Sequence, residues 1–469
     1  MLTDLNFLRV GEPWPPKCER ERLERYANNK LLFEGDHQLV YKEWIRLLRS
    51  DIHATLEIIF NWHKRLSTLW ADLLLSEPPT ITSGNSESSE QEEIENIVES
   101  NSLICTAYEV ALDVSRHGVG LYNVYADGGK GVIEPTQPDI WYPVVDPDNV
   151  KRFLYHVLAW TVDETVGKDK YKFLKVRIHE RGQLTARKYQ IVDGYIYKEV
   201  ATPEAFFTGL SDFAIIPVNN TITSDRAIGM DDYKDIDTII QELEIRVGQI
   251  SRILDKHSDP NMYGDESAIE DDPETGESYM KGGGKFFPVA PGGTPPGYLT
   301  WEANMEANWK EIDTLMQQLY IISETSEACF GQLKQGMVES GSALKRLMIA
   351  PLAKAQRIRM RMDPALKKAI KLCSEVNGGV KLEKVNISWQ DGIPTDEKEM
   401  SEVMAIRTGS TGGKSTVSTY TAIKRLDNKT DAEVQKEMDR IADDEEMLNP
   451  TPGVNFKPNN TPPGGDVGG

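Results

Sequence analysis

The sequence lacks the patterns that mark disulfide-stapled, membrane-spanning and zinc-binding proteins. Its 469 residues contain four cysteines, Cys18, Cys105, Cys329 and Cys373, which lie far apart and form no CxxC pair. They predict neither a disulfide framework nor a zinc site, and a reducing compartment is the simpler expectation. No apolar run approaches the ~20 residues that cross a bilayer. The first residues lack the basic and apolar segments of a signal peptide.

Catalytic spacings are missing as well. The seven histidines show no HExxH or paired spacing, and single ones such as His117 and His179 are more often structural than catalytic. No Ser/His/Asp set and no carboxylate pair can be nominated for nucleophilic or acid–base chemistry. We therefore expect a protein that is not an enzyme and that carries no cofactor and no metal.

The charge is acidic overall, with one basic exception. A formal net charge of -21 argues against a sequence-reading DNA-binding protein with a broad basic face. Between Ala343 and Leu372, however, nine basic residues stand against the single acid Asp363. Two kinds of partner could balance these charges. One is acids of the same fold or of a neighbouring subunit, which is typical of helical charge runs, and the other is a nearby polyanion.

The hydrophobic pattern predicts an α+β chain. Charged helices are expected from Lys17 to about Leu75 and from about Glu92 to Arg116. Five β-branched and aromatic runs between Leu121 and Val192, closed by the run 215–220, predict an antiparallel meander. A helix then runs from about Asp231 to Ser258, followed by about forty residues rich in Gly, Pro, Asp and Glu. Two long helices therefore flank one irregular stretch and form a hairpin with a small module at its tip.

The segment from Trp301 to Glu375 reads as helix, polar loop and second helix. The loop is roughly 328–341 and contains three glycines. The second helix opens with SGSALK, should bend at Pro351, and can be split at Asp363-Pro364. A strand within 380–390, acidic helices to about Leu448 and a Pro/Gly/Asn-rich end complete the chain.

One motif imitates a phosphate-binding loop. GSTGGKST (409–416) has three residues between Gly409 and Gly413, where a Walker A loop needs four before its GK pair, and helical residues lead into it instead of a strand. A turn between two helices is the better interpretation.

The order of these elements, with its local motifs, resembles the portal proteins of tailed bacteriophages, specifically the siphophage-type family. The resemblance runs from Leu73 to Leu448. It rests on ADLLLSEPPTI (71–81), HGVGLYNVY (117–125), PVVDPDNVKRFLYHV (143–157), FAIIPVNN (213–220) and, as the most specific match, SGSALK (340–345). The glycine-rich stretch 409–415 is longer than the family pattern leads us to expect.

The resemblance implies a domain organisation. It assigns 1–225 to the wing (N-terminal helices and antiparallel sheet), 226–257 to the first stem helix, 258–300 to the clip, 301–327 to the second stem helix, 328–341 to the tunnel loop, 342–393 to the wing again (long bent helix and strand), 394–448 to the α-helical crown, and 449–469 to a disordered tail. The expected fold class is α+β and portal-like.

The resemblance also implies a function. Family members form a ring, usually a dodecamer, at the capsid vertex of the virion, through which double-stranded DNA is packaged and later ejected without sequence specificity. The implied partners are the terminase large subunit, the head-to-tail adaptor, and the major capsid and scaffolding proteins, with assembly in the host cytoplasm and no membrane. The alternatives are a nucleotide-driven protein built on GSTGGKST, or a structural scaffold without a channel.

Two groups of site residues follow. Gln332, Lys334, Gln335 and Glu339 would form the DNA-facing tunnel loop, with Lys334 near the phosphates or paired with a neighbour's Glu339. Six apolar residues of the stem helices would form the ring interface, so that a monomer exposes the first three: Ile240, Val247, Ile250, Ile312, Leu315 and Leu319. We further hypothesise that most of the basic helix lies behind the channel wall and pairs with acids of the wing and crown.

Overall fold

The computed structural model describes residues 1–41, 58–85, 88–166, 169–258, short pieces between 262 and 298, and then 305–332, 346–378, 381–390, 397–410, 412–426 and 431–448. The chain divides into two compact units, the first comprising 1–338 with 342–393 and the second 339–341 with 394–469. Helices and strands both contribute, which confirms the expected α+β class. None of the helices in these ranges is long and apolar enough to cross a membrane.

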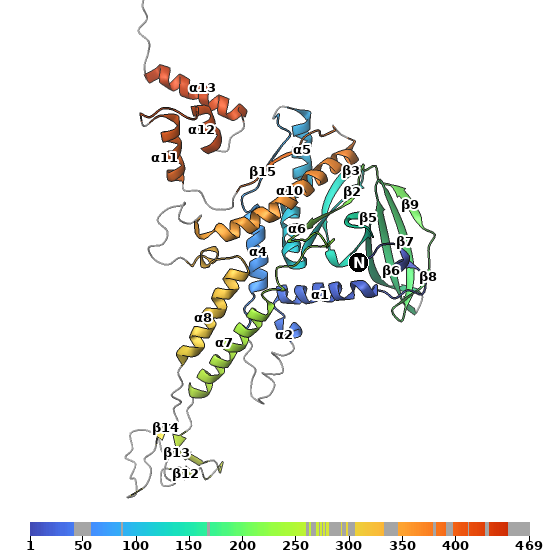
Figure 1. The fold of residues 1–469 in the computed structure, drawn as a ribbon, viewed down its shortest axis with the longest axis vertical. Helices are drawn as coiled ribbons and strands as arrows, with labels where there is room; N and C mark the ends of the chain where they lie inside the picture. The colour runs from blue at the N-terminus through green and yellow to red at the C-terminus, as the bar shows by residue number, and fades with distance from the viewer. Residues whose placement is uncertain are drawn as a thin grey trace, which may run out of the picture. The chain divides into compact units, whose positions relative to one another are not determined.

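In the first unit the larger sheet lies at one edge, and α4, α5, α6 and α10 lie to one side of the strands (Figure 1). Its α-helices among the described residues are α1 (Arg20–Glu34), α2 (His37–Val40), α4 (Trp62–Leu75), α5 (Ser89–Ser100), α6 (Leu103–His117), α7 (Asp237–Ser258), α8 (Met305–Ile322) and α10 (Ile349–Asn377). The single helix expected from Glu92 to Arg116 is in fact two, α5 and α6. They are separated at Ser102, whose φ of 44° is left-handed and cannot continue a helix.

The antiparallel region forms two sheets instead of the one meander that the sequence predicts. The larger has the order β4 (Trp141–Asp146), β5 (Asn149–Val166), β6 (Asp169–Glu180), β7 (Gln183–Val192) and β8 (Tyr195–Glu199), with β9 (Glu204–Phe207) also on β7. The smaller has the order β10 (Ile215–Asn219), β2 (Val119–Asp127) and β3 (Lys130–Thr136). The closing run thus pairs with the first strand, Ile216 opposite Tyr122, because both residues join the core beneath α10.

Helix α10 covers the smaller sheet. Its residues Ile358, Met362, Leu366 and Ile370 recur every four positions and are buried in the largest hydrophobic core. Contact with β3 is close at Gly131, where a Cβ atom would lie 2.6 Å from both the carbonyl oxygen and Sγ of Cys373. A side chain larger than hydrogen at this position would therefore separate helix and sheet.

The two prolines of this helix have different effects. The helical run is interrupted at Met348, after the helical residues Arg346 and Leu347, and α10 begins at Ile349, so Pro351 lies in its first turn, where its missing N–H would have no intrahelical partner. Pro364 lies inside the continuous helix, so Asp363-Pro364 does not split it.

Short strands complete the first unit. The strand predicted within 380–390 is confirmed as β15 (Asn386–Ser388), which pairs with β1 (Thr80–Thr82). Between α7 and α8 lie two small antiparallel pairs, β11 (Met262–Tyr263) with β14 (Gly297–Tyr298) and β12 (Ile269–Asp271) with β13 (Ser278–Met280).

The second unit contains α11 (Glu397–Thr408), α12 (Thr419–Leu426) and α13 (Asp431–Leu448). The motif GSTGGKST connects α11 to α12, so a helix precedes it where a phosphate loop needs a strand. Its last residue, Thr416, donates its backbone N–H to the carbonyl of Arg407 at 2.7 Å. The interpretation of a turn between two helices is confirmed. The tail predicted to be disordered, 449–469, lies outside the described residues.

Candidate functional site

Helices α7 and α8 lie side by side as a hairpin with its own hydrophobic core (Figure 1). Each contributes an apolar stripe, and Leu66 of α4 closes the core at one end. The buried members are Leu66, Ile236, Ile240, Leu243, Ile250, Ile312 and Leu319. The hairpin is therefore held together within one subunit.

This core corrects one expectation about the predicted ring interface. Ile240 and Ile250 are only 0% and 4% exposed, so an isolated subunit does not present them to solvent. Val247 is partly buried against the same core. Helix α8 covers the stripe because its own apolar residues, Ile312 and Leu319 among them, face α7. Exposed apolar surface on the hairpin is found instead at Leu254, Trp309 and Ile321.

The two ends of the loop that follows α8 lie close together. It starts with a 3-10 turn, Glu327–Phe330, in which the Phe330 ring packs edge-on against Trp62 at 5.1 Å between ring centroids. At its other end Met348 comes before α10, and the Cys329 thiol lies 3.4 Å from the Met348 sulfur. The chain therefore leaves at Cys329 and returns at Met348 with these two residues in contact.

Of the four predicted loop residues, the structure places one. Gln332 is exposed, and its backbone N–H donates to the Glu327 carbonyl at 3.2 Å. Lys334, Gln335 and Glu339 lie outside the described residues.

Ionic side chains connect the base of the hairpin to the N-terminal helices. Arg25 of α1 binds Asp231 at 2.7 Å and Asp237 at 2.6 Å. On α2, His37 Nδ1 lies 2.6 Å from Glu244 Oε1, and both side chains are fully buried. Residues of two N-terminal helices therefore bind acidic side chains just before α7 and in its first half.

A histidine of α4 lies in the same network. His63 Nε2 is 3.0 Å from Asp237 Oδ1, and its ring lies against Tyr233. Burial lowers the pKa of His63, although the neighbouring Asp237 carboxylate acts in the opposite direction. The neutral ring can donate one N–H to Asp237, which suits a positioning role at the hairpin base.

The basic helix finds most of its partners within the first unit. Lys354 pairs with Asp232 at 2.8 Å, Lys367 with Asp363 at 2.6 Å, and Lys368 with Asp212 at 2.6 Å. Arg357 pairs with Glu324. Two more cations donate hydrogen bonds to backbone carbonyls, Arg359 to that of Leu73 and Lys371 to that of Glu383, each at 2.8 Å. Two of these cations, Lys367 and Lys368, pair with acids of the predicted wing, as we hypothesised, whereas Lys354 and Arg357 pair with acids of the predicted stem ranges. Pairing with acids of the crown, and the place of the helix behind a channel wall, stay predictions.

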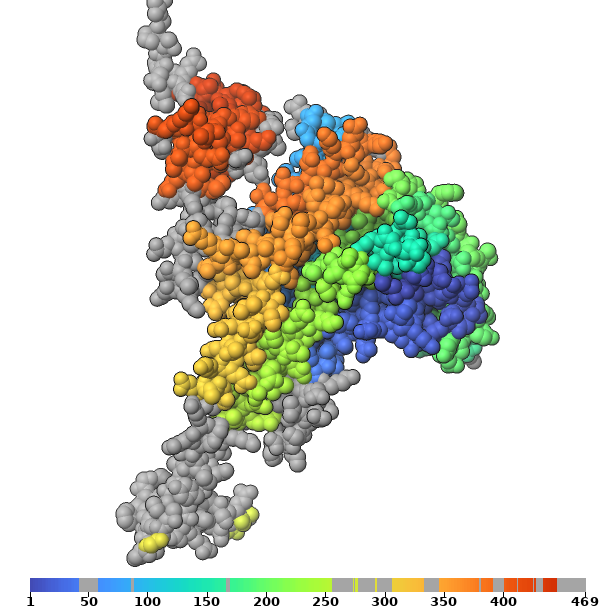
Figure 2. Space-filling model, viewed as in Figure 1, coloured from blue at the N-terminus to red at the C-terminus, as the bar shows by residue number. Residues whose placement is uncertain are grey.

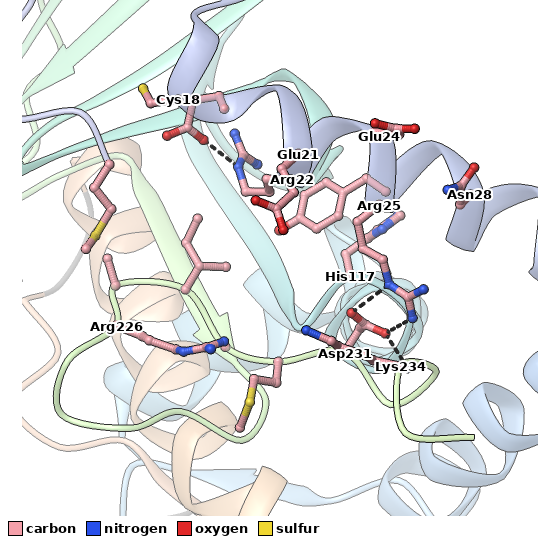
Figure 3. Close-up of a pocket in the computed structure, with 17 residues that line it drawn as sticks. Cys18, Glu21, Arg22, Glu24, Arg25, Asn28, His117, Arg226, Asp231 and Lys234 are labelled. Carbon is pink, nitrogen blue, oxygen red and sulfur yellow. Dashed lines mark hydrogen bonds and ion pairs between the residues drawn. The ribbon is translucent and has the colours of Figure 1, made fainter. Parts of the chain in front are cut away.

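A pocket of about 570 Å³ lies between α1 and the segment 226–234 (Figure 3). Arg25 and Asp231 meet across it, and Arg22 is held by Glu19 at 2.6 Å. His117 lies at its edge with its ring 4.6 Å from that of Tyr26, and burial lowers the His117 pKa well below its usual value. These contacts join α1 to the entry of α7. Among the described residues, no cluster of three or more His, Cys, Asp and Glu could hold a metal ion.

The sequence-based reasoning missed the buried pair of Lys354 and Asp232. A signal was present, because Lys354 lies four residues before Ile358 and so shares the buried stripe of α10. A lysine at a core position predicts a buried acid opposite it.

Comparison with known families assigns the chain. The family described as phage portal protein, SPP1 Gp6-like, matches residues 16–451. The chain belongs to this family. It is a portal protein, the subunit of a ring at the capsid vertex.

Solved structures of gene transfer agent (GTA) particles are also similar. The virion of the native particle matches at 12% identity over 78% of this chain and 89% of that chain, with a TM-score of 0.44. The neck of the empty particle, computed with C6 symmetry, matches at 12% identity over 82% and 93%, with a TM-score of 0.46. The neck of the native particle, computed with C12 symmetry, matches at 11% identity over 78% and 89%, with a TM-score of 0.43. No curated protein sequence matches the chain.

Proposed function

We propose that the chain assembles into a ring of twelve copies whose axial channel carries double-stranded DNA into the capsid and later out of it. The observation that carries the proposal is the family match over residues 16–451. The spacing of the loop ends is compatible with it: the chain leaves at Cys329 and returns at Met348, whose sulfurs are 3.4 Å apart, so the segment between them can project from one place.

In this proposal the α7–α8 hairpin is the stem, and the small strands between the two helices belong to the clip. Residues 328–341 are the tunnel loop, the two sheets with α10 belong to the wing, and α11 to α13 form the crown. The stem residues Ile240, Val247, Ile250, Ile312, Leu315 and Leu319 hold the two helices of the hairpin together, and neighbouring copies contact the outer surface of that hairpin.

The composition of the tunnel loop suits a channel through which DNA slides. A protein that neutralises roughly 6–10 phosphates binds DNA firmly and with strong salt dependence. The loop contains one lysine, Lys334, with Gln332, Gln335 and one acid, Glu339. So few contacts allow the DNA to slide. We propose that Lys334 and the two glutamines contact its phosphates.

The remaining roles extend this proposal. The terminase motor and then the head-to-tail adaptor would bind at the clip, and capsid and scaffolding proteins at the wing. The protein acts in the virion, after assembly in the host cytoplasm, and does so as a structural subunit without catalysis.

The test is the assembly state of the purified protein. We expect native mass measurement to give one closed species at a single high multiple of the 52.8 kDa subunit, and top views in negative stain to show a central hole. A protein that stays monomeric at all concentrations, or particles without a hole, would contradict the proposal. Nucleotide binding in a titration would favour the alternative built on GSTGGKST.

A further inference from the structure

One face of α10 exposes two large apolar side chains, with an alanine and a glutamine between them. Ile349, Ala353, Gln356 and Met360 follow one another at spacings of four, three and four residues, so they form one stripe. Ile349 and Met360 are 65% and 61% exposed. Figure 2 shows this part of α10 on the near face of the first unit.

Two arginines flank this stripe, which we call the α10 stripe. Arg346 and Arg361 are exposed, and neither forms an ion pair with any residue in the described part of the chain. They differ in this respect from the six cations of α10 that are held by acids or carbonyls. Exposed apolar side chains beside cations that have no ion pair among the described residues are typical of a protein–protein contact surface.

A surface of opposite charge is present on α5. This helix, Ser89–Ser100, contains five glutamates and no basic residue. Glu92, Glu95 and Glu99 are exposed, and their spacing of three and four residues places them on one face. No ion pair to these three is found among the described residues.

The two surfaces cannot meet inside one subunit. Helix α5 packs on the far end of α10, where Asn377 donates to Glu93 at 2.9 Å. Arg361 lies sixteen residues before Asn377, which is about 24 Å along a helix. The acids of α5 and the α10 stripe therefore form two separate, complementary patches on one molecule.

We propose that the α10 stripe docks on the acidic face of α5 from the adjacent copy of this chain. The inference rests on the proposed ring and specifies one of its contacts. Two different patches that bind each other between identical copies generate a head-to-tail interface, which closes into a ring when the rotation permits. Arg361 meets glutamates of the neighbouring α5, and Ile349 and Met360 are covered at the same interface.

A charge exchange tests this contact in the full chain. Arg361→Glu places like charges together, and we expect ring formation to weaken by about tenfold or more at moderate salt. Adding Glu95→Lys and Glu99→Lys to the same chain restores complementarity and should restore the ring. Lys198→Glu, on the exposed face of β8, is the matched control and should assemble as the wild type does.

Disulfide trapping provides a second readout. Met360→Cys with Asn96→Cys, in a background where the exposed Cys18 and Cys105 are replaced by serine, should give a ladder of covalent multimers on oxidation. The pair Met360→Cys with Lys198→Cys should give none.

The outcomes separate this contact from the ring itself. If the wild type forms rings but Arg361→Glu assembles equally well and no ladder appears, the contact is wrong and the ring stands. If Arg361→Glu leaves rings intact and reduces DNA retention instead, the stripe faces a polyanion and the proposal is overturned. If the wild type forms no ring, the proposed function fails first.

Discussion

Lys354 Nζ lies 2.8 Å from Asp232 Oδ1, and this ion pair joins the long helix α10 to the segment that enters the hairpin. The two side chains are 9% and 8% exposed. Asp232 also accepts hydrogen bonds from Ser115 at 2.7 Å and from Asn220 at 2.8 Å. The carboxylate thus has three partners from distant parts of the chain, and Lys354 supplies the compensating charge.

Lys354→Met should destabilise the fold strongly. The change leaves Asp232 buried without its cation and removes the contact of the ammonium group with the Trp70 ring, 4.4 Å from its centroid. Removing one partner of a buried ion pair costs about 3 kcal/mol or more. Urea denaturation of the full chain should show this loss in the free energy of unfolding.

Lys367→Met is the matched control for that substitution. Lys367 pairs with Asp363 at 2.6 Å one turn away on the same helix, and its side chain is 33% exposed. A solvent-accessible pair of this kind contributes roughly 1 kcal/mol or less. If both variants lose the same free energy of unfolding, the buried pair of Lys354 and Asp232 contributes no more to stability than the exposed pair does.

Two buried histidines should make the protein sensitive to acid. His156 and His179 lie opposite each other on β5 and β6, and burial lowers the pKa of His156 to about 3 and that of His179 to about 4. An unfolded histidine has a pKa of about 6.5. Between pH 6.5 and 4 the unfolded chain therefore binds protons that the native state does not, and stability falls as the pH is lowered. Each histidine contributes up to about 1.4 kcal/mol per pH unit.

Unfolding curves at several pH values check this prediction. His179 is the better site for substitution, because both of its ring nitrogens lack a hydrogen-bond partner among the described residues. His179→Leu should flatten the pH dependence and raise stability at pH 5.

Asp113 has the opposite effect on the pH dependence of stability. Burial raises its pKa to about 6, so between pH 6 and 4 the native state binds a proton that the unfolded chain does not, and stability rises as the pH is lowered. Asp113→Asn should steepen the curve, and an unchanged slope in both variants would contradict the assignment.

Ile240 should stabilise the single subunit. The residue is fully buried between α7 and α8, so Ile240→Ala removes apolar contacts and leaves a cavity. Such a truncation costs about 2–5 kcal/mol. The loss should be independent of protein concentration, whereas a residue used only between copies would give a loss that depends on concentration. Leu254→Ala, at a 57% exposed position on α7, is the control and should change monomer stability little.

Lys334→Glu should alter the passage of DNA and leave the fold unchanged. The substitution replaces the one cation of the proposed tunnel loop with a charge that repels phosphate. We expect a changed packaging rate or packaged length, with normal ring assembly. Lys334→Gln removes the charge without reversing it and should have a smaller effect. Unchanged packaging by Lys334→Glu would exclude the proposed contact.

Much of this architecture could be predicted from local sequence patterns. The hairpin helices, β15 and the α11–α12 turn follow from periodicity and turn residues. Pairing over long distances could not be predicted, because β10 reads as an ordinary strand and only the core beneath α10 places Ile216 opposite Tyr122. The burial of Ile240 was missed for a similar reason. An apolar stripe looks the same whether a helix of its own chain or of a neighbour covers it.

The most direct test of the account is a reconstruction of the assembled ring that locates the segment between Cys329 and Met348. We predict that this segment of every copy lies on the inner rim, facing a hole wide enough for duplex DNA. A reconstruction with the segment on the outer rim, or particles without an axial opening, would contradict the account.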